Sequence, residues 1–274
     1  DVTIESASGV GIFLAGVYRF VIDQVEVLGW SGGAAIEVIG GHDGVVQNSR
    51  VVQTGSGLGT GIRARGGSRN VVVRANRVDQ GTGFRRGIQA GGSTGIEFFR
   101  PPLQPTDGQP DFEATDIEIE GNVVTGGDGS VVSAGTDRVV IRNNYLLRPG
   151  IRAVRFLNEN AGGEWGTTRN TQVLNNVIVF TSAPSSVVNV GAGTDPTSFI
   201  FARNRWYNES NPAASTPVLP VAEANGVYGV NPNVNPDDVL AQSFAWGQWL
   251  LNLTTVPDTY AVSNAAGYRL AIPG

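Results

Sequence analysis

The chain of 274 residues contains no cysteine, so neither a disulfide framework nor a thiolate metal site can hold its fold together. Lysine is also missing, because all 19 basic residues are arginine. This removes the usual Schiff-base amine and the commonest amine base from any mechanism. Apolar runs stay far shorter than the roughly 20 residues that a membrane-spanning helix needs, so the sequence predicts no membrane span. A net charge of -5 without a basic tail argues against nucleic acid as the main partner.

Glycine, by contrast, occupies 38 positions, and 41% of residues are hydrophobic while only 16% are charged. This composition favours many short strands and tight turns over helices. One pattern recurs along most of the chain: an apolar strand, an asparagine, an apolar pair, a glycine-rich turn and a second short strand. Its copies read VVQNSRVV, VVRANRVD, IEGNVVTG, IRNNYLLR, VLNNVIVF and FARNRWYN. The aligned residues are Asn48, Asn76, Asn122, Asn144, Asn176 and Asn204, with Val25 at that place in an earlier copy, VIDQVEVL.

Asparagine suits such a repeated position for a physical reason. When copies stack, each amide donates to one neighbour and accepts from the other, which forms a ladder inside a turn. Asparagine also tolerates the left-handed backbone that a sharp bend requires. The spacing from Asn122 to Asn144 is about one coil of a β-helix, and larger spacings are one coil plus a loop. The sequence therefore predicts an all-β fold, a right-handed parallel β-helix of about seven or more coils.

The second strand of each copy places one outward polar residue beside inward apolar residues, as period-2 alternation requires. Adjacent coils lie roughly 4.8 Å apart, so six outward residues are expected to follow one face for about 25 Å, the length of several sugar rings. The inward residues of this alignment are Ile36, Ile62, Ile88, Val132, Val154 and Val188. The predicted polar column is Glu37, Arg63, Gln89, Ser133, Arg155 and Asn189.

The same repeat sets the expected organisation of the chain. Residues 1–236 are predicted to form the β-helix, with loop insertions at about 98–116, 158–170 and 207–220. Loops of this kind wall grooves and carry function. Residues 237–274 carry Phe244, Trp246 and Trp249 on an apolar run, and we expect them to cap the last coil of the same domain, whose strand edges would otherwise stay unpaired.

The repeats resemble those of bacterial secreted right-handed β-helix proteins, the superfamily of pectate lyases, polygalacturonases, and alginate and chondroitin lyases. The resemblance spans roughly residues 20–236 and includes the segments ARNRWYN and GVYGVNPNVNP. It implies a secreted or cell-surface protein that acts on a polysaccharide. The stretch VVSAGTDRVVIRNN is similar to the coil that carries the catalytic lysine of alginate and chondroitin lyases, but Gly135 stands at the lysine position and Leu157 near that of the accompanying arginine. The paired aspartates, His-Gly and Arg-Ile-Lys signatures of polygalacturonases are missing.

The outward column is the first candidate site. Arg63, Arg65 and Arg155 could neutralise the carboxylates of an acidic polysaccharide, because arginine offers bidentate geometry to a carboxylate. The amide and hydroxyl groups of Gln89, Ser133 and Asn189 would then bond sugar hydroxyls. The alternative is that these are the polar residues that any solvated sheet face requires.

Two further groups are candidates for acid and base chemistry. His42, the only histidine, precedes Asp43 in a predicted turn, where the carboxylate could orient it as a general base; the alternative is a solvated turn residue. Glu159 and Glu164 lie near Trp165 and Arg169, which suggests an aromatic platform for a sugar beside carboxylates that could act as acid and base.

The acidic insertion gives the one cofactor that the sequence suggests. Carboxylates near a glycine can ligate Ca²⁺ through oxygen, although the EF-hand spacing is missing here and a solvated loop is the alternative. The candidate ligands are Asp107, Asp111, Glu113 and Asp116.

Two functions of different classes follow. The first is an extracellular carbohydrate-active protein that binds, and in one version cleaves, an acidic polysaccharide along the polar column, as a lyase or a hydrolase. The second is a structural or adhesive cell-surface solenoid without catalysis, which the missing lysine and the low charge favour. Polar groups converging on one face would support the first, and a smooth face would support the second.

Overall fold

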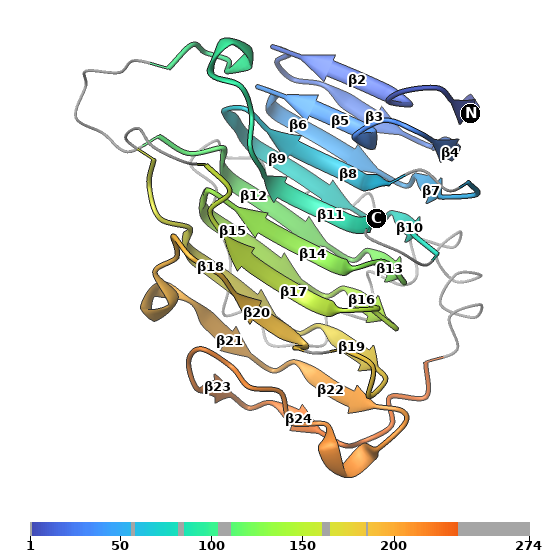
Figure 1. The fold of residues 1–274 in the computed structure, drawn as a ribbon, viewed down its shortest axis with the longest axis vertical. Helices are drawn as coiled ribbons and strands as arrows, with labels where there is room; N and C mark the ends of the chain where they lie inside the picture. The colour runs from blue at the N-terminus through green and yellow to red at the C-terminus, as the bar shows by residue number, and fades with distance from the viewer. Residues whose placement is uncertain are drawn as a thin grey trace, which may run out of the picture.

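A computed structural model describes residues 2–55, 58–81, 85–103, 111–160, 165–184 and 186–234. These residues wind into a solenoid whose strands form three parallel sheets, here called A, B and C (Figure 1). Each turn of the chain contributes one strand to each sheet in that order. Sheet B has seven strands, so the described chain contains seven three-stranded coils, in agreement with the predicted parallel β-helix.

The strands of a sheet lie in the order in which the chain reaches them. Sheet A consists of β1 (Val2–Ala7), β4 (Val25–Trp30), β7 (Arg50–Val52), β10 (Arg77–Asp79), β13 (Val123–Thr125), β16 (Tyr145–Leu147), β19 (Val177–Phe180), β22 (Arg205–Asn208) and β24 (Val227–Tyr228). Sheet B consists of β2 (Ile12–Ala15), β5 (Ala34–Ile39), β8 (Gly59–Arg65), β11 (Arg85–Gly91), β14 (Gly129–Ala134), β17 (Arg152–Leu157) and β20 (Val188–Val190). Sheet C consists of β3 (Val21–Asp23), β6 (His42–Gln47), β9 (Ser68–Arg74), β12 (Ala114–Glu120), β15 (Thr136–Arg142), β18 (Arg169–Leu174), β21 (Ile200–Ala202) and β23 (Glu223–Ala224).

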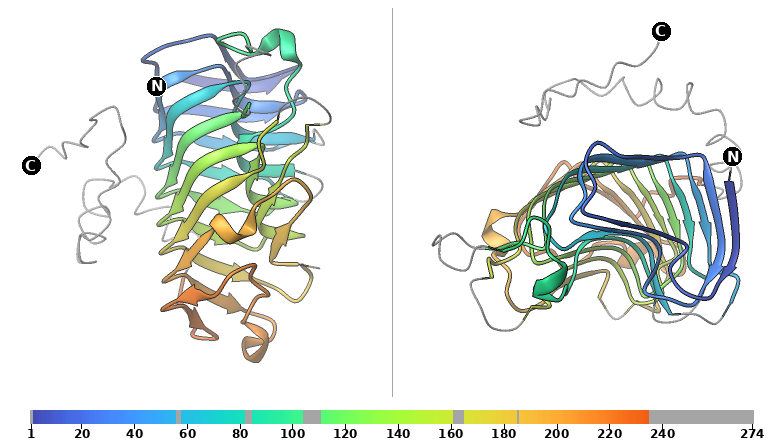
Figure 2. Two further views of the ribbon diagram at one scale, coloured as in Figure 1. Left: turned by 90° about the vertical axis from the view of Figure 1, so that its left-hand side faces the viewer. Right: turned by 90° about the horizontal axis from the view of Figure 1, so that it is seen from above.

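Short 3-10 turns lie in the connections, at η1 (Ile96–Phe98), η2 (Pro196–Ser198) and η3 (Pro212–Ala214). The two longest connections between sheets B and C are residues 92–113 and 158–168, because β12 begins at Ala114 and β18 at Arg169. Seen from above, the described parts of these connections project from one side of the solenoid (Figure 2). No helix among the described residues is both long and apolar enough to cross a membrane.

The interior is filled by apolar side chains that stack on the same position of the next coil. Isoleucine and valine dominate because their branched side chains pack well on a pleated surface. Each buried side chain of this size contributes about 1.5–3 kcal/mol relative to an exposed one. The inward column of sheet B is Ile36, Ile62, Ile88, Val131, Val154 and Val188.

Asparagines form a ladder at the turn before sheet A, as the repeat predicts. Each side-chain amide donates to the amide oxygen of the next coil, over 3.1 Å from Asn76 to Asn122 and 3.0 Å from Asn122 to Asn144. The ladder continues through Asn176 to Asn204 with distances of 3.0 and 2.9 Å. All five side chains are buried, so their mutual pairing avoids the cost of about 1–3 kcal/mol for each unpaired group.

The prediction for Asn48 is wrong by one residue. Ser49 occupies the ladder position of that coil, since its backbone N–H donates to Asn76 Oδ1 over 3.0 Å. Asn48 instead has a φ of 50°, in the left-handed region, and its side chain donates to Asp23. The left-handed residue of each bend is thus the one before the ladder, a place taken elsewhere by Asn143. Both positions accept asparagine, which explains why the repeat pattern selected the wrong one.

A carboxylate ends the ladder. Glu223 Oε1 accepts hydrogen bonds from the backbone and the side-chain amide of Asn204, at 2.9 and 2.7 Å. Its other oxygen accepts from the indole of the buried Trp206 and from the hydroxyl of Tyr228. Burial and Glu223 raise the pKa of Tyr228 to about 12. The described chain therefore satisfies the last rung with an acceptor from β23, while the expected cap at residues 237–274 lies outside the described residues.

Candidate functional site

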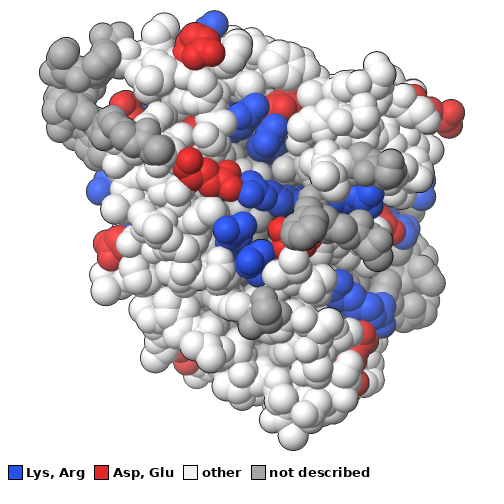
Figure 3. Space-filling model, in the orientation of Figure 1, with Lys and Arg blue, Asp and Glu red and all other residues white. Residues whose placement is uncertain are grey.

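Sheet B presents a column of outward side chains in register on neighbouring strands. Figure 3 shows arginine side chains gathered along the middle of this face, with a few acidic side chains among them. The strand pairing assigns seven residues to the column: Phe13, Glu37, Arg63, Gln89, Val132, Arg155 and Asn189. The column that the sequence predicts therefore exists, with one exception.

Ser133 does not belong to it. Gln89 pairs with Val132, and Val132 pairs with Arg155, so Ser133 lies one position farther along β14 and its hydroxyl contacts Thr136 at 2.6 Å. Val132 instead forms a small buried apolar cluster with Ala134 and Leu157 on the outer face. Two consecutive valines precede Ser133, so alternation alone could not tell which of them points inward. The polar column is consequently interrupted by an apolar stretch on β14.

At one end of the column, Glu37 holds two arginines. Arg63 donates to both carboxylate oxygens, at 2.9 and 3.0 Å, and Arg65 donates to one of them at 2.6 Å. Glu37 is only 3% exposed. Burial opposes its ionisation, but the hydrogen bonds and charges of the two arginines outweigh burial and lower the pKa of Glu37 below its ordinary value. Arg63 and Arg65 are therefore engaged within the protein and share one negative charge.

Farther along, Gln89 and Glu159 both contact Arg86. The guanidinium donates to the two oxygens of Glu159 at 2.6 and 3.2 Å and to Gln89 Oε1 at 2.9 Å. Thr60 also donates to the same Gln89 oxygen. Glu159 thus lies at the sheet B face, but it is committed to an ion pair. Both oxygens of Glu159 are thus occupied by the guanidinium of Arg86.

Arg155 differs from the other arginines of this face. The buried Nε atoms of Arg152 and Arg155 both lack a hydrogen-bond partner among the described residues, but Arg152 also donates to Asp128 at 2.9 Å, whereas no described residue accepts a hydrogen bond from Arg155. No described carboxylate forms an ion pair with it. Burial and the nearby charges of Arg152 and Arg86 lower the pKa of Arg155. Arg155 is therefore a guanidinium in a locally positive environment that retains unused donors.

Arg86 and Arg152 were not among the residues that the sequence singled out. They share a column of their own, because both pair with Gly129 of β14. Each lies three residues before the predicted column, separated from it by two inward residues such as Gly87 and Ile88. Two consecutive inward residues break the period of two. Simple alternation therefore assigns Arg86 and Arg152 to the wrong face. Their position at the start of equivalent strands is the signal that could have identified them.

The described parts of the two long connections contact each other. The ring of Trp165 lies 5.3 Å from that of the fully buried Phe99, and Trp165 pairs with Asp111 through a β-bridge. Arg169 contacts Asp137 at 3.2 Å and lies over the ring of Phe112. The described members of the predicted Glu159, Glu164, Trp165 and Arg169 group thus have separate partners, and Glu164 lies outside the described residues.

His42 begins strand β6 rather than lying in a turn. It is 8% exposed, its ring stacks on Tyr18 at 4.8 Å, and its Nε2 lies 3.0 Å from the carbonyl oxygen of Arg100. Asp43 has a φ of 54° and accepts a hydrogen bond from Asn70. The structure therefore uses His42 to attach the connection after β11 to an early coil, on a sheet other than the arginine face.

The acidic insertion divides its carboxylates among different partners. Glu113 is fully buried and accepts hydrogen bonds from the backbone of Gly66 and from the backbone and hydroxyl of Thr94. Asp116 belongs to β12 and pairs with Arg138. Asp107 lies outside the described residues. Within the described ranges, no three of the side chains from histidine, cysteine, aspartate and glutamate gather as a metal site would require, so the Ca²⁺ hypothesis gains no geometric support there.

Comparison with known proteins identifies the fold and no reaction. Residues 1–178 match the family model described as a right handed beta helix region. This match covers more than half of the chain and confirms the handedness that the repeat predicts. Searches of the curated proteins and of the solved structures give no match. Function therefore has to be argued from the site itself.

Proposed function

We propose that this chain, which belongs to the right-handed β-helix family, binds an acidic polysaccharide on the outer face of sheet B. The observation that carries the proposal is Arg155, a half-buried guanidinium to which no described residue offers a hydrogen bond or an ion pair. A carboxylate or sulfate group of a ligand would give it the charged hydrogen bonds that the protein itself does not supply.

The charge around Arg155 supports an anionic ligand. Five arginines at this face, Arg63, Arg65, Arg86, Arg152 and Arg155, accompany three carboxylates, those of Glu37, Asp128 and Glu159. The carboxylates hold the paired arginines in fixed positions. These arginines therefore contribute positive potential without having to be ordered when a ligand binds. An anion therefore meets a prearranged surface, which lowers the cost of ordering side chains on binding.

The geometry of the column supports a polymer. Equivalent positions recur once per coil, about 4.8 Å apart, so an extended chain lying along the solenoid axis would meet a new set of side chains at each coil. Asn189 on β20 follows Arg155 and supplies an amide. The secreted or cell-surface location expected from the resemblance belongs to the same proposal.

Cleavage is a separate question from binding. Glu159 is the acidic candidate that lies at the face, but it is held by Arg86. This pairing favours the version of the proposal in which the face binds the polysaccharide without cleaving it. The two versions share the binding surface and differ only in whether a bond is broken.

One panel of assays tests both statements. Binding of polygalacturonate, alginate and a neutral glucan to the full chain is measured by calorimetry at low and high salt, and the same mixtures are assayed for unsaturated products and for new reducing ends. We expect the uronate polymers to bind and the neutral glucan not to bind at this face, with affinity falling as salt screens the charges over about 8–10 Å. New products would identify an enzyme, and their type would separate a lyase from a hydrolase. Absence of binding to every anionic polymer, sulfated ones included, would refute the proposal.

A further inference from the structure

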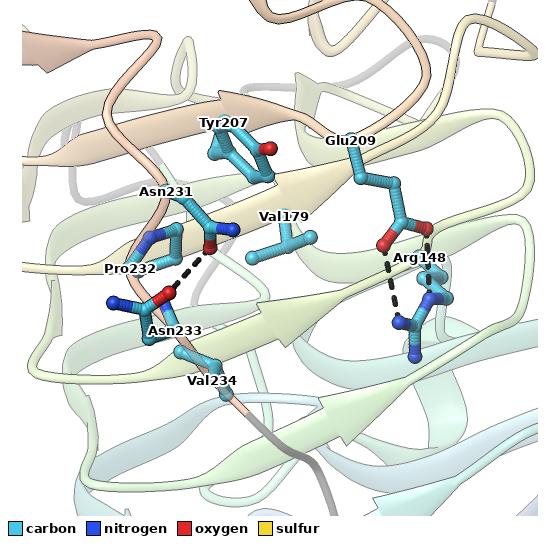
Figure 4. A pocket seen from close by; sticks show the side chains of 8 residues that line it. All are labelled: Arg148, Val179, Tyr207, Glu209, Asn231, Pro232, Asn233 and Val234. Atoms are coloured by element: carbon cyan, nitrogen blue, oxygen red, sulfur yellow. Dashed lines mark hydrogen bonds and ion pairs between the residues drawn. The ribbon is translucent and has the colours of Figure 1, made fainter.

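A concave surface lies on sheet A, at the end of the solenoid away from the first coil. It is a pocket of about 430 Å³ between β19, β22 and the chain that follows β24 (Figure 4). This volume falls in the range of small-molecule sites, roughly 300–1,000 Å³. The lining residues are Arg148, Val179, Tyr207, Glu209, Asn231, Pro232, Asn233 and Val234.

The charged side chains of this pocket balance each other, whereas arginines outnumber carboxylates on the sheet B face. Arg148 donates to both oxygens of Glu209, at 2.8 and 3.1 Å, so the only two charged residues of the lining neutralise each other. Glu209 raises the pKa of Arg148 above its ordinary value, mainly through these hydrogen bonds. The pair carries no net charge, yet both partners keep hydrogen-bonding capacity toward the solvent, because they are 48% and 28% exposed.

The rest of the pocket combines an apolar floor with unused polar groups. Val179, Tyr207 and Val234 belong to an apolar cluster on the outer face of sheet A. Figure 4 shows Tyr207, Asn231 and Glu209 placed around Val179, with the Asn231 carboxamide directed toward it. Asn231 Oδ1 accepts from the backbone of Asn233 at 2.8 Å, which fixes this side chain and leaves its NH₂ group without a described partner. The Tyr207 hydroxyl has none either among the residues that the structure describes.

We propose that this pocket binds the ring of a neutral pyranose, as a carbohydrate site separate from the sheet B face. One face of such a ring carries carbon-bound hydrogens that pack on valine and on an aromatic ring. Its hydroxyls act both as donors and as acceptors. A carboxamide, a phenol and a neutral guanidinium–carboxylate pair offer both functions around an apolar floor, whereas an anionic sugar would find no unpaired cation here.

The test uses the full chain and small probes. Methyl pyranosides of glucose, galactose and mannose, and methyl glucuronoside as the charged counterpart, are titrated by protein NMR at millimolar concentration. We expect saturable binding of at least one neutral pyranoside that does not depend on salt. Tyr207→Phe removes one hydroxyl and Glu209→Gln removes the carboxylate, and each should weaken binding about fivefold.

A matched control is available on the same sheet. Glu26→Gln disrupts the ion pair of Glu26 with Arg50, at the far end of sheet A, and should leave pyranoside binding unchanged. Urea unfolding of each variant confirms that it is folded. Polyuronate binding by Tyr207→Phe should equal that of the unaltered chain, so the two carbohydrate proposals succeed or fail independently.

Three results would overturn the inference: no saturable binding of any neutral pyranoside, equal affinity in Tyr207→Phe and Glu209→Gln, or stronger binding of the glucuronoside than of the glucoside.

Discussion

The same repeat builds the asparagine ladder inside the solenoid and the arginine face outside it. The two differ in how completely their polar side chains are hydrogen-bonded. From Asn76 to Asn204, every ladder side chain finds a partner in the next coil, and Glu223 closes the last rung. On sheet B, Arg155 has no hydrogen-bond or ion-pair partner among the residues that the structure describes. The comparison separates polar residues that complete the fold from the polar residue on which we base the proposed binding site.

The difference follows from the chemistry of the two side chains. An amide has both a donor and an acceptor, so a column of identical asparagines satisfies itself at every step. Guanidinium groups only donate, so a column of arginines needs carboxylates from elsewhere. Glu37 and Glu159 supply them for part of the face, and the unused donors of Arg155 are the reason why we propose a binding surface rather than a solvated sheet.

The largest expected effect is on the ladder. Asn144→Ala removes the acceptor of two buried N–H groups of Asn122 and the donor to Asn176, so we expect the free energy of unfolding to fall by about 2–4 kcal/mol. The matched variant Asn189→Ala, on the outer face, should change it by no more than about 0.5 kcal/mol. Urea unfolding measures both. Equal losses in the two variants would remove the distinction between inside and outside columns.

Glu223→Gln tests how the ladder ends. The substitution keeps one oxygen but replaces the other acceptor with a donor, so either Asn204 or the Trp206 and Tyr228 pair loses its partner. We expect a loss of about 1–3 kcal/mol in urea unfolding. The pKa of Tyr228, raised to about 12 in the unaltered chain, should fall toward 10, as read by tyrosinate absorbance against Tyr228→Phe. An unchanged tyrosine titration would show that Glu223 does not contact Tyr228.

A smaller effect, dependent on pH, is expected for Arg63→Gln. The folded chain lowers the pKa of Glu37 from 4.5, so the stabilisation by its ionised form is complete above that pH and is lost as pH falls through the folded value. Without Arg63 we expect a loss of about 1–2 kcal/mol at pH 7 that shrinks below pH 4.5. Arg50→Gln, in a more exposed ion pair, is the control and should lose less. A loss that stays constant down to pH 3 would contradict the role of Glu37.

The sequence predicted the solenoid well because the residue types that recur in its repeat each have one structural role. Inward isoleucine and valine and the buried asparagines admit few substitutes, so five of six ladder positions were found. Prediction failed where two residues fit one slot equally, at Asn48 beside Ser49 and at Val132 beside Ser133. Pattern reasoning could not foresee that Glu37 binds Arg63 and Arg65 while Arg155 has no partner among the described residues, because pairing depends on side-chain geometry across coils.

The most direct test of the account compares Arg155→Gln with Arg19→Gln, since both remove one positive charge and Arg19 lies exposed in the connection between β2 and β3. Calorimetry with polygalacturonate at low salt measures affinity, and urea unfolding checks the fold. We predict that Arg155→Gln weakens binding about tenfold, the effect of one charged hydrogen-bonded contact, while the free energy of unfolding changes by less than about 0.5 kcal/mol. Arg19→Gln should leave the affinity nearly unchanged. Equal polygalacturonate affinity in Arg155→Gln and the unaltered chain would contradict the claim that the unpaired arginine marks the binding site.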